Sequence, residues 1–130
     1  AGQIDSALEC KKGSRILILG LTFKENVPDL RNSKVFDLIK TLREKNYTVD
    51  VHDPLASQEE ARQVFSIDLI KDLERVKPYD CIVGAVSHAQ YKSLNFHQLK
   101  KLLKSHGLLA DLKGIWQTQK LCDNFRVLEL

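Results

Sequence analysis

The pattern of apolar and polar residues predicts short strands that alternate with helices. Arg15 to Leu19 (RILIL) is almost continuously apolar, as a strand is when both faces of a parallel sheet are covered. YTVDVHDP alternates apolar and polar residues up to a proline, which predicts a strand at Thr48 to His52. CIVGAV at Cys81 to Val86 is a third buried run. LLAD at Leu108 to Asp111 predicts a fourth strand, and FRVLEL, at the end of the chain, predicts a fifth.

Between the predicted strands, apolar residues recur at helical spacing. One stripe consists of Val35, Phe36, Leu38, Ile39 and Leu42. It predicts a helix of about 13 residues, for which Asn32 or Ser33 is the expected N-cap. Ser57 and Glu60 have the spacing of a capping box, so a short helix is expected to begin there and to reach Phe65.

Two further helices are expected in the second half of the chain. Leu69, Leu73 and Val76 share one face if Asp68 to Val76 is helical. Asn95 is the expected cap of FHQLKKLLKSH, and Gly107 is expected to end that helix. Strands alternating with helices imply parallel, right-handed crossovers. The predicted fold is therefore α/β: a three-layer, doubly wound, Rossmann-like domain with a mostly parallel sheet flanked by helices.

Length and composition fit one soluble domain. Residues 1–13 are polar, which indicates the tail of a helix or a cloning remnant, and residues 14–130 are expected to form the domain. Apolar residues make up 43% and charged residues 28%, and no apolar run approaches the roughly 18 residues of a membrane span. The net charge of +3, from 20 basic and 17 acidic residues, is too small to indicate nucleic-acid binding. We expect no membrane and no nucleic-acid partner.

The cysteines add little to the chemistry. Cys10, Cys81 and Cys122 are odd in number and widely spaced, which favours neither a disulfide framework nor a zinc site. Thiols of this kind are typical of the reduced cytoplasm, and no secretion signal is recognisable. Cys81 lies inside an apolar run and is expected to be a packed, inert thiol. No metal site is predicted.

The segment after the first strand is unusually long. Eleven residues, Leu21 to Arg31, separate it from the next helix, whereas such connections usually take about 2 to 6. In a doubly wound sheet, ligands bind outside the carboxyl ends of the strands. Four polar segments are expected there: this loop, HDP at 52–54, SHAQ at 87–90 and DLKG at 111–114.

The long loop offers charges for an anionic ligand. A dinucleotide fingerprint GxGxxG is missing, because only Gly20 is present, so an NAD site of that standard type is not expected. Lys24 and Arg31 are placed to bind anionic oxygens, the lysine as a point charge and the arginine as a planar fork. The alternative for both is an ordinary exposed loop residue.

Other polar residues near the strand ends have weaker signals. Asp53 stands where a ribose-binding acid lies in dinucleotide folds. His88 is a candidate acid or base, with a helix cap or a structural hydrogen bond as the alternative that we favour. Trp116 is expected to be a core or interface anchor. The chain carries no GxSxG, no HExxH and no phosphate loop ending in GK[ST]. No catalytic residue is predicted.

Four motifs together resemble one family. GSRILILGLTFKENVPDLRNSKVFDLI, VHDP, AVSHAQY and ADLKGIW occur in the order seen in the C-terminal domain of the UDP-glucose and GDP-mannose dehydrogenase family. The resemblance covers Gly13 to Trp116. The sequence of the loop, GLTFKENVPDLRNS, is similar to that found in the branch of the family that oxidises UDP-N-acetylhexosamines in bacterial capsule or O-antigen synthesis. UDP-glucose enzymes usually have a loop more like AFKxxTxDxRES.

The resemblance implies a role for four residues. Phe23 and Lys24 fall where the family contacts the nucleotide sugar, and Lys113 falls where relatives often carry an arginine directed at the substrate. Arg31 falls where the family reaches toward the NAD that is bound mainly by an N-terminal domain. The length of the loop then follows from its need to reach ligands held between two domains.

The resemblance also implies what this chain lacks. The family oxidises the C6 alcohol of a nucleotide sugar to a carboxylate, using two NAD molecules and a cysteine in a Cys-Pro-Lys-Asp type motif. None of the three cysteines lies in such a motif, so the chain alone is expected to be inactive. The whole enzyme is expected to be a cytoplasmic homo-oligomer. The alternative is a free-standing nucleotide-binding, phosphate-binding or interaction module without catalysis.

Overall fold

The computed structural model describes residues 13–22, 35–73, 76–112, 115–116 and 126–129. Its strands are β1 (Arg15–Leu19), β2 (Thr48–His52), β3 (Tyr79–Gly84), β4 (Leu103–Asp111) and β5 (Arg126–Glu129). Its helices are α2 (Val35–Glu44), α3 (Gln58–Phe65), α4 (Ala89–Lys92) and α5 (Phe96–Leu102). Among the described elements, strands and helices alternate except where α4 is followed by α5 and β4 by β5.

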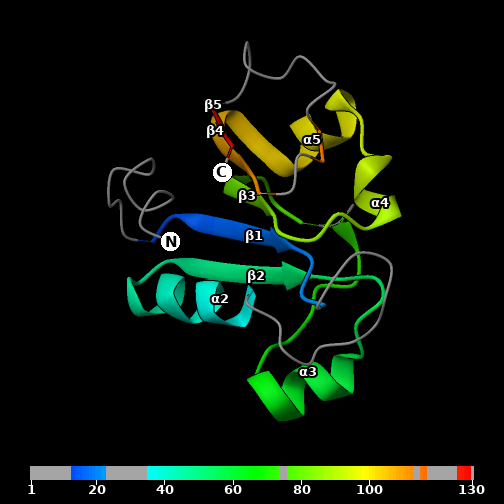
Figure 1. The fold of residues 1–130 in the computed structure, drawn as a ribbon. Coiled ribbons are helices and arrows are strands. Elements are labelled where there is room, and N and C mark those ends of the chain that lie inside the picture. Colours follow the sequence, from blue (N-terminus) through cyan, green and yellow to red (C-terminus); the bar gives the residue numbers. More distant parts are fainter. Residues whose placement is uncertain (1–12, 23–34, 74–75, 113–114, 117–125, 130) are drawn as a thin grey trace.

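The described strands form one parallel sheet in the order β2-β1-β3-β4-β5 (Figure 1). The chain runs from β1 to β2 on one side and then crosses to β3 on the other side of β1. The strand order therefore reverses at β1, which is the point where a doubly wound sheet binds its ligands. The predicted fold class and the fifth strand are confirmed.

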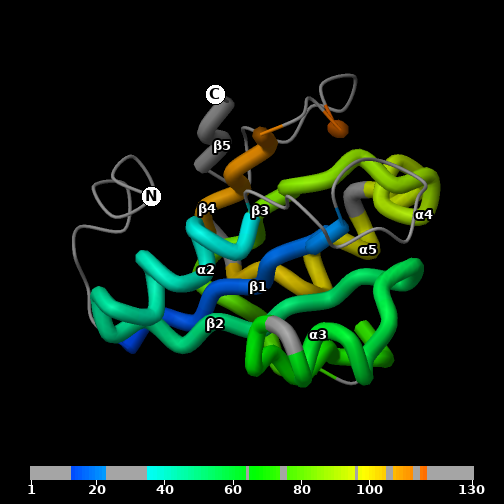
Figure 2. The backbone as a smooth tube through the Cα atoms, turned by 60° about the horizontal axis from the view of Figure 1, so that its bottom comes forward, coloured from blue at the N-terminus to red at the C-terminus, as the bar shows by residue number. Residues whose placement is uncertain are grey.

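Two apolar layers cover the two faces of the sheet. Successive residues of a strand point to opposite faces, so Ile16 and Ile18 lie in one layer whereas Leu17 and Leu19 lie in the other. The first layer includes Ile39 and Leu42 of α2 and Ala61 of α3. The second includes Tyr91, Leu94, Leu99 and Leu102 from the region of α4 and α5. Both views show α4 and α5 grouped together and well apart from α2 (Figure 1, Figure 2). The domain thus has three layers.

The predicted capping residues of two helices are confirmed. The side chain of Ser57 accepts a hydrogen bond from the Glu60 N–H at the start of α3. Asn95 and Gln98 form a reciprocal capping box at the start of α5, with N···O distances of 3.0 and 2.8 Å. Both capping motifs span only a few residues, so they could be predicted from the sequence without knowledge of the fold. The caps expected for α2, Asn32 and Ser33, lie outside the described residues.

The helix predicted at Asp68 to Val76 is wrong. Leu69 and Ile70 pair with β2 instead: Leu69 forms a parallel bridge with Val51, and the Ile70 N–H donates to the Val51 carbonyl at 2.8 Å. The Leu69 N–H donates to the side chain of Gln58. Backbone groups that bond to a neighbouring strand and side chain cannot form the predicted helical ladder.

Two element boundaries also differ from the predictions. For α2, whose bounds are Val35–Glu44, the residues before Val35 lie outside the described part of the chain, so the expected length of about 13 residues stays a prediction. β3 ends at Gly84, because the N–H groups of Ala85 and Val86 both turn to the Leu19 carbonyl. α5 ends at Leu102 rather than before Gly107, and β4 already begins at Leu103, which pairs with Tyr79. The helical spacing of the leucines had suggested that the helix continues past Leu102. The residues from Leu103 onward instead form the first part of β4, which pairs with β3.

None of the helices in the described part of the chain is both long and apolar enough to cross a bilayer.

Candidate functional site

The carboxyl ends of the first four strands are joined by backbone hydrogen bonds. The Gly20 N–H donates to the His52 carbonyl at 2.8 Å, and the Ala85 N–H donates to Leu19 at 3.0 Å. The Leu112 N–H donates to the Gly84 carbonyl at 3.1 Å. The starts of the four polar segments that the sequence placed at this edge therefore lie next to one another.

Gly20 turns the chain at the end of β1. Its φ is +107°, a conformation that residues with a side chain rarely adopt. A Cβ atom added there would lie 2.5 Å from the Cβ of Val86 and 2.8 Å from the Val86 backbone nitrogen. Val86 therefore packs so closely against this turn that only glycine fits there without strain.

Asp53 holds two loops with one carboxylate. Its Oδ2 accepts hydrogen bonds from the N–H groups of Leu21 and Thr22, at 2.8 and 3.0 Å. Its Oδ1 accepts from the N–H groups of Leu55 and Ala56, at 2.8 and 3.2 Å. The side chain is fully buried. One side chain therefore fixes the start of the loop after β1 relative to the turn after β2.

His88 brings a third loop to the same carboxylate. Its Nε2 lies 2.9 Å from Asp53 Oδ2 and 2.9 Å from Thr22 Oγ1, and its side chain is 1% exposed. A carboxylate oxygen only accepts hydrogen bonds, so Nε2 carries a hydrogen and donates to Asp53. We call Thr22, Asp53 and His88 the Asp53 cluster.

The environment of Asp53 favours its charged form. Burial alone raises the pKa of this carboxyl group, because it penalises the charge. Hydrogen bonds from the Leu21 N–H, the His88 ring and the N–H groups of Leu55 and Thr22 outweigh burial, and the pKa of Asp53 lies below its ordinary value. The carboxylate is therefore negatively charged at neutral pH.

Tyr91 in α4 links the end of β2 to the region after β4. Its hydroxyl donates to the His52 carbonyl at 2.7 Å and lies 2.8 Å from His52 Nδ1. The Trp116 indole N–H donates to the Tyr91 carbonyl at 2.9 Å. Burial raises the pKa of Tyr91, and the negative charge of Asp53 raises it further. Burial lowers the pKa of His52, and the charge of Asp53 offsets only part of that effect.

Asp111 closes the turn after β4. Its Oδ1 accepts from the Ile115 N–H at 2.7 Å, and its Oδ2 accepts from the Trp116 N–H at 2.9 Å. The expected anchor role of Trp116 in the core is confirmed, since its ring is buried in the apolar layer that contains Tyr91. Lys113 lies between Asp111 and Ile115, outside the described residues.

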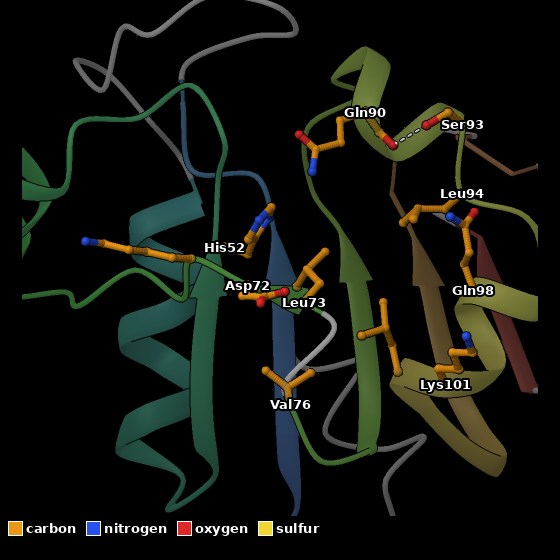
Figure 3. A pocket seen from close by; sticks show the side chains of 11 residues that line it. His52, Asp72, Leu73, Val76, Gln90, Ser93, Leu94, Gln98 and Lys101 are labelled. Atoms are coloured by element: carbon orange, nitrogen blue, oxygen red, sulfur yellow. Dashed lines mark hydrogen bonds between the residues drawn. The ribbon is translucent and has the colours of Figure 1, made fainter.

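A cavity of about 650 Å³ lies on the face of the sheet that carries α4 and α5. His52 reaches it from the end of β2, and Gln90, Leu94 and Lys101 reach it from the opposite side (Figure 3). The hydroxyl of Ser93 donates to the Gln90 carbonyl at 2.7 Å and shapes this wall. Most of the side chains that line the cavity are polar or charged, and the apolar ones are Leu73, Val76, Leu94 and Leu102.

The structure decides some of the sequence-based site predictions and leaves others open. Phe23, Lys24, Arg31 and Lys113 all lie outside the described residues, so their predicted contacts are untested. Asp53 faces backbone N–H groups in the interior rather than a ribose.

The structure tests the predictions for His88 and Cys81. His88 forms the structural hydrogen bond that was favoured, although it makes no side-chain cap to α4. Cys81 is buried, as expected.

Sequence reasoning missed the roles of Thr22, His52 and Tyr91. All three are polar side chains in or beside the segments that follow predicted strands, which is the signal that was available. Their partners lie 39 to 66 residues away in the chain, so only the fold brings them together. Within the described part of the chain, no group of three or more histidine, cysteine, aspartate or glutamate residues is arranged to hold a metal ion. The described site positions loops and lines a cavity, which suits binding.

Comparisons with known proteins agree on one family. Residues 17–118 match the UDP-glucose/GDP-mannose dehydrogenase family, UDP binding domain. A UDP-N-acetyl-D-glucosamine 6-dehydrogenase of Pseudomonas aeruginosa is 42% identical over 108 residues, which are 83% of this chain and 25% of that protein. A UDP-glucose 6-dehydrogenase of Rhizobium meliloti (strain 1021) is 29% identical over 111 residues, which are 85% of this chain and 25% of that protein. The chain spans about a quarter of the length of these curated relatives.

A solved structure has the same fold. The NDP-N-acetyl-D-galactosaminuronic acid dehydrogenase from Methanosarcina mazei Go1 superposes with a TM-score of 0.85 and 23% identity, over 98% of this chain and 27% of that one. The higher identity to the UDP-N-acetyl-D-glucosamine enzyme supports the branch that the loop sequence indicated. Because the family match extends from β1 to beyond Trp116, the chain belongs to the UDP-glucose/GDP-mannose dehydrogenase family and corresponds to its UDP-binding domain.

Proposed function

We propose that this chain is the substrate-binding C-terminal domain of an NAD-dependent dehydrogenase that oxidises the C6 hydroxyl of a UDP-N-acetylhexosamine to the uronic acid. The product would serve cell-surface polysaccharide synthesis, and the enzyme would act in the cytoplasm as a homo-oligomer. The observation that carries the proposal is the match of residues 17–118 to the family's UDP-binding domain. The 42% identity to a UDP-N-acetyl-D-glucosamine enzyme, against 29% to a UDP-glucose enzyme, favours the N-acetylated substrate.

Within this proposal the loop after β1 contacts two ligands. Phe23 and Lys24 bind the nucleotide sugar together with Lys113, and Arg31 reaches toward NAD. Two observations support this division. The first is that the sequence has only Gly20 of a GxGxxG fingerprint, so an NAD site of the standard type is not expected in this domain. The Asp53 cluster fixes Leu21 and Thr22, the two residues directly before Phe23, at the edge where doubly wound sheets bind ligands.

The activity is tested with the full-length enzyme that contains this chain. NADH formation is measured with UDP-N-acetyl-D-glucosamine, UDP-N-acetyl-D-mannosamine and UDP-glucose as substrates. We expect two NADH per sugar oxidised and a higher kcat/KM with an N-acetylated sugar. The 130-residue chain alone is the control and should form no NADH, because the proposed cofactor site and nucleophile lie outside it. A full-length enzyme that binds UDP but oxidises no UDP-sugar would contradict the proposed activity.

The division of the loop is tested by two substitutions in the full-length enzyme. Lys24→Ala should chiefly lower kcat/KM for the nucleotide sugar, and Arg31→Ala should chiefly lower it for NAD. Losing a charged hydrogen bond costs about 1.5 to 3 kcal/mol, which is roughly 10-fold to 150-fold in the corresponding constant. Equal losses for both substrates in both variants, in step with a lower melting temperature, would show that the loop is merely structural.

A further inference from the structure

We propose that Asp53 and His88 are positioning residues for ligand binding: they fix where the loop after β1 leaves the sheet and thereby raise the affinity for a nucleoside diphosphate. Neither residue touches the ligand in this proposal. The inference rests on the proposed function, in which residues directly after Thr22 contact the nucleotide.

The first support is the number of backbone groups that meet at one carboxylate. Asp53 accepts two successive N–H groups from the loop after β1 and two from the turn after β2. Two hydrogen bonds to adjacent peptide groups fix both the position and the direction of a segment. The exit of the loop is therefore set during folding, and a ligand that binds the loop does not have to order these residues.

The second support is that His88 connects Asp53 to α4, which contributes to the lining of the cavity. His88 directly precedes α4, and its Nε2–H bridges Asp53 and Thr22. Gln90 and Leu94 line the cavity in Figure 3. The same buried pair thus holds the loop after β1 and the beginning of α4 in one arrangement. Ligand groups that span the two loops would find both in place.

The third support is the contrast with Asp50, a carboxylate within β2, whereas Asp53 directly follows that strand. Asp50 accepts a hydrogen bond from the Tyr79 hydroxyl at 2.8 Å and lies 3.8 Å from an Arg15 guanidinium nitrogen. These contacts join β2 to β1 and β3 near the other end of the sheet. Asp50 therefore stabilises the strands without touching the ligand-binding edge, and it is a matched control for Asp53.

The experiment compares UDP binding by Asp53→Asn, Asp50→Asn and wild-type full-length enzyme, with a melting curve for each. Asparagine has almost the same shape as aspartate, but its NH₂ group cannot accept hydrogen bonds, so one of the two loops loses its acceptor. UDP is titrated calorimetrically well below each melting temperature. We expect the dissociation constant of Asp53→Asn to rise about tenfold, and that of Asp50→Asn to stay within twofold of wild type.

A second pair of variants decides the question if Asp53→Asn does not fold. The side-chain nitrogen of glutamine can occupy the place of His88 Nε2 and donate to Asp53, whereas leucine cannot donate. His88→Gln should bind UDP within about twofold of wild type, and His88→Leu should bind about tenfold more weakly. Rescue by the conservative variant is not expected if His88 only fills space in the core.

The outcomes separate this inference from the proposed function. Failure of the wild-type enzyme to bind UDP would overturn the proposed function itself. Tight binding by wild type together with unchanged affinity in folded Asp53→Asn, or in both His88 variants, would overturn the positioning role. The inference also fails if Asp50→Asn weakens UDP binding as much as Asp53→Asn does, because the effect would then follow general stability.

Discussion

Asp53 and Asp111 both lie where a strand ends: Asp53 directly follows β2, and Asp111 is the last residue of β4. Both are buried, and both accept backbone N–H groups through both carboxylate oxygens. Asp111 bonds to residues four and five positions later, in its own turn. Asp53 bonds to its own turn and also to residues 31 to 35 positions away on two other loops. An aspartate where a strand ends thus closes a single turn in one case and joins three loops in the other.

The strand order explains the difference. β2 lies beside β1, and β1 lies beside β3, so the loops after these three strands meet where the order of the sheet reverses. The end of β4 lies away from this point, next to β5. A short-range contact such as that of Asp111 removes little chain entropy, because its ends are already close in sequence. The contacts of Asp53 instead hold together three loops that are far apart in the sequence.

The largest effect in this comparison is expected from a substitution at the turn beside Asp53. Gly20→Ala would place a Cβ at positive φ and within 2.8 Å of the Val86 backbone nitrogen, which cannot move without moving its strand end. We expect a loss of about 3 kcal/mol or more in the free energy of unfolding. Urea unfolding followed by circular dichroism measures it.

Gly84→Ala is the matched control on the side of Asp111. Its added Cβ would meet atoms of the Trp116 and Ile115 side chains at 2.8 and 2.9 Å. Side chains can shift where backbone cannot, so we expect a loss of only about 1 to 3 kcal/mol. A larger loss for Gly84→Ala than for Gly20→Ala would contradict the view that the turn at the reversal point is the more constrained of the two.

The next effect concerns the two carboxylates themselves. Asp53→Asn should lower the free energy of unfolding by about 2 to 3 kcal/mol at pH 7, and Asp111→Asn by about 1 to 2 kcal/mol, because more donors lose an acceptor at Asp53. Urea unfolding of both variants measures the difference. Equal losses would mean that the long-range bonds of Asp53 contribute no more than the local ones of Asp111.

The effect of Asp53→Asn should also depend on pH. The folded pKa of Asp53 lies below its ordinary value of 3.8, so the unfolded chain binds a proton more readily than the folded chain. The stabilisation is therefore complete well above pH 3.8 and is lost as the pH falls through the folded pKa. The difference between wild type and Asp53→Asn should shrink in acid. A difference that stays constant down to the acid transition would show that the charge of Asp53 is not responsible.

Sequence reasoning succeeded where the signal was local. The apolar runs located the strands, and Ser57 and Asn95 marked the starts of α3 and α5 because a capping bond spans only three residues. It failed at Asp68 to Val76, where a bond from Ile70 to Val51 overrode the leucine spacing. The start of β4 was missed because its partner, Tyr79, lies far away in the chain.

The candidate site was only partly readable for the same reason. The strand-end rule placed the polar segments at one edge, and the backbone bonds from Gly20 and Leu112 confirm that they meet there. Which polar side chain touches a ligand and which one supports a loop depends on burial and on partners distant in sequence. Asp53 therefore looked like a ribose-binding acid in the sequence, although its carboxylate is occupied by backbone donors of two loops.

The smallest expected effect concerns His52, whose pKa depends on the charge of Asp53. The Tyr91 hydroxyl donates to the His52 carbonyl, so His52 Nδ1–H donates to that hydroxyl, an arrangement that a neutral ring satisfies. Burial lowers the pKa of His52 below its ordinary value of 6.5, and Asp53 only partly offsets this. His52 therefore binds a proton near pH 6.5 in the unfolded chain but only at lower pH in the folded chain. The free energy of unfolding should fall as the pH drops below 6.5.

His52→Asn isolates this contribution, because the asparagine amide can still donate to Tyr91 but does not titrate. We expect wild type and variant to have similar stability slopes above pH 7, and the variant to have the shallower slope between about pH 6.5 and pH 5, where an ordinary histidine titrates. Urea unfolding at closely spaced pH values measures both slopes, and the contributions of the other histidines cancel in the difference. Parallel curves throughout this range would mean that the nearby Asp53 charge fully compensates the burial of His52. The Asp53 carboxylate would then stabilise a protonated neighbour as well as the loops, whereas Asp111 accepts hydrogen bonds from the backbone N–H groups of Ile115 and Trp116.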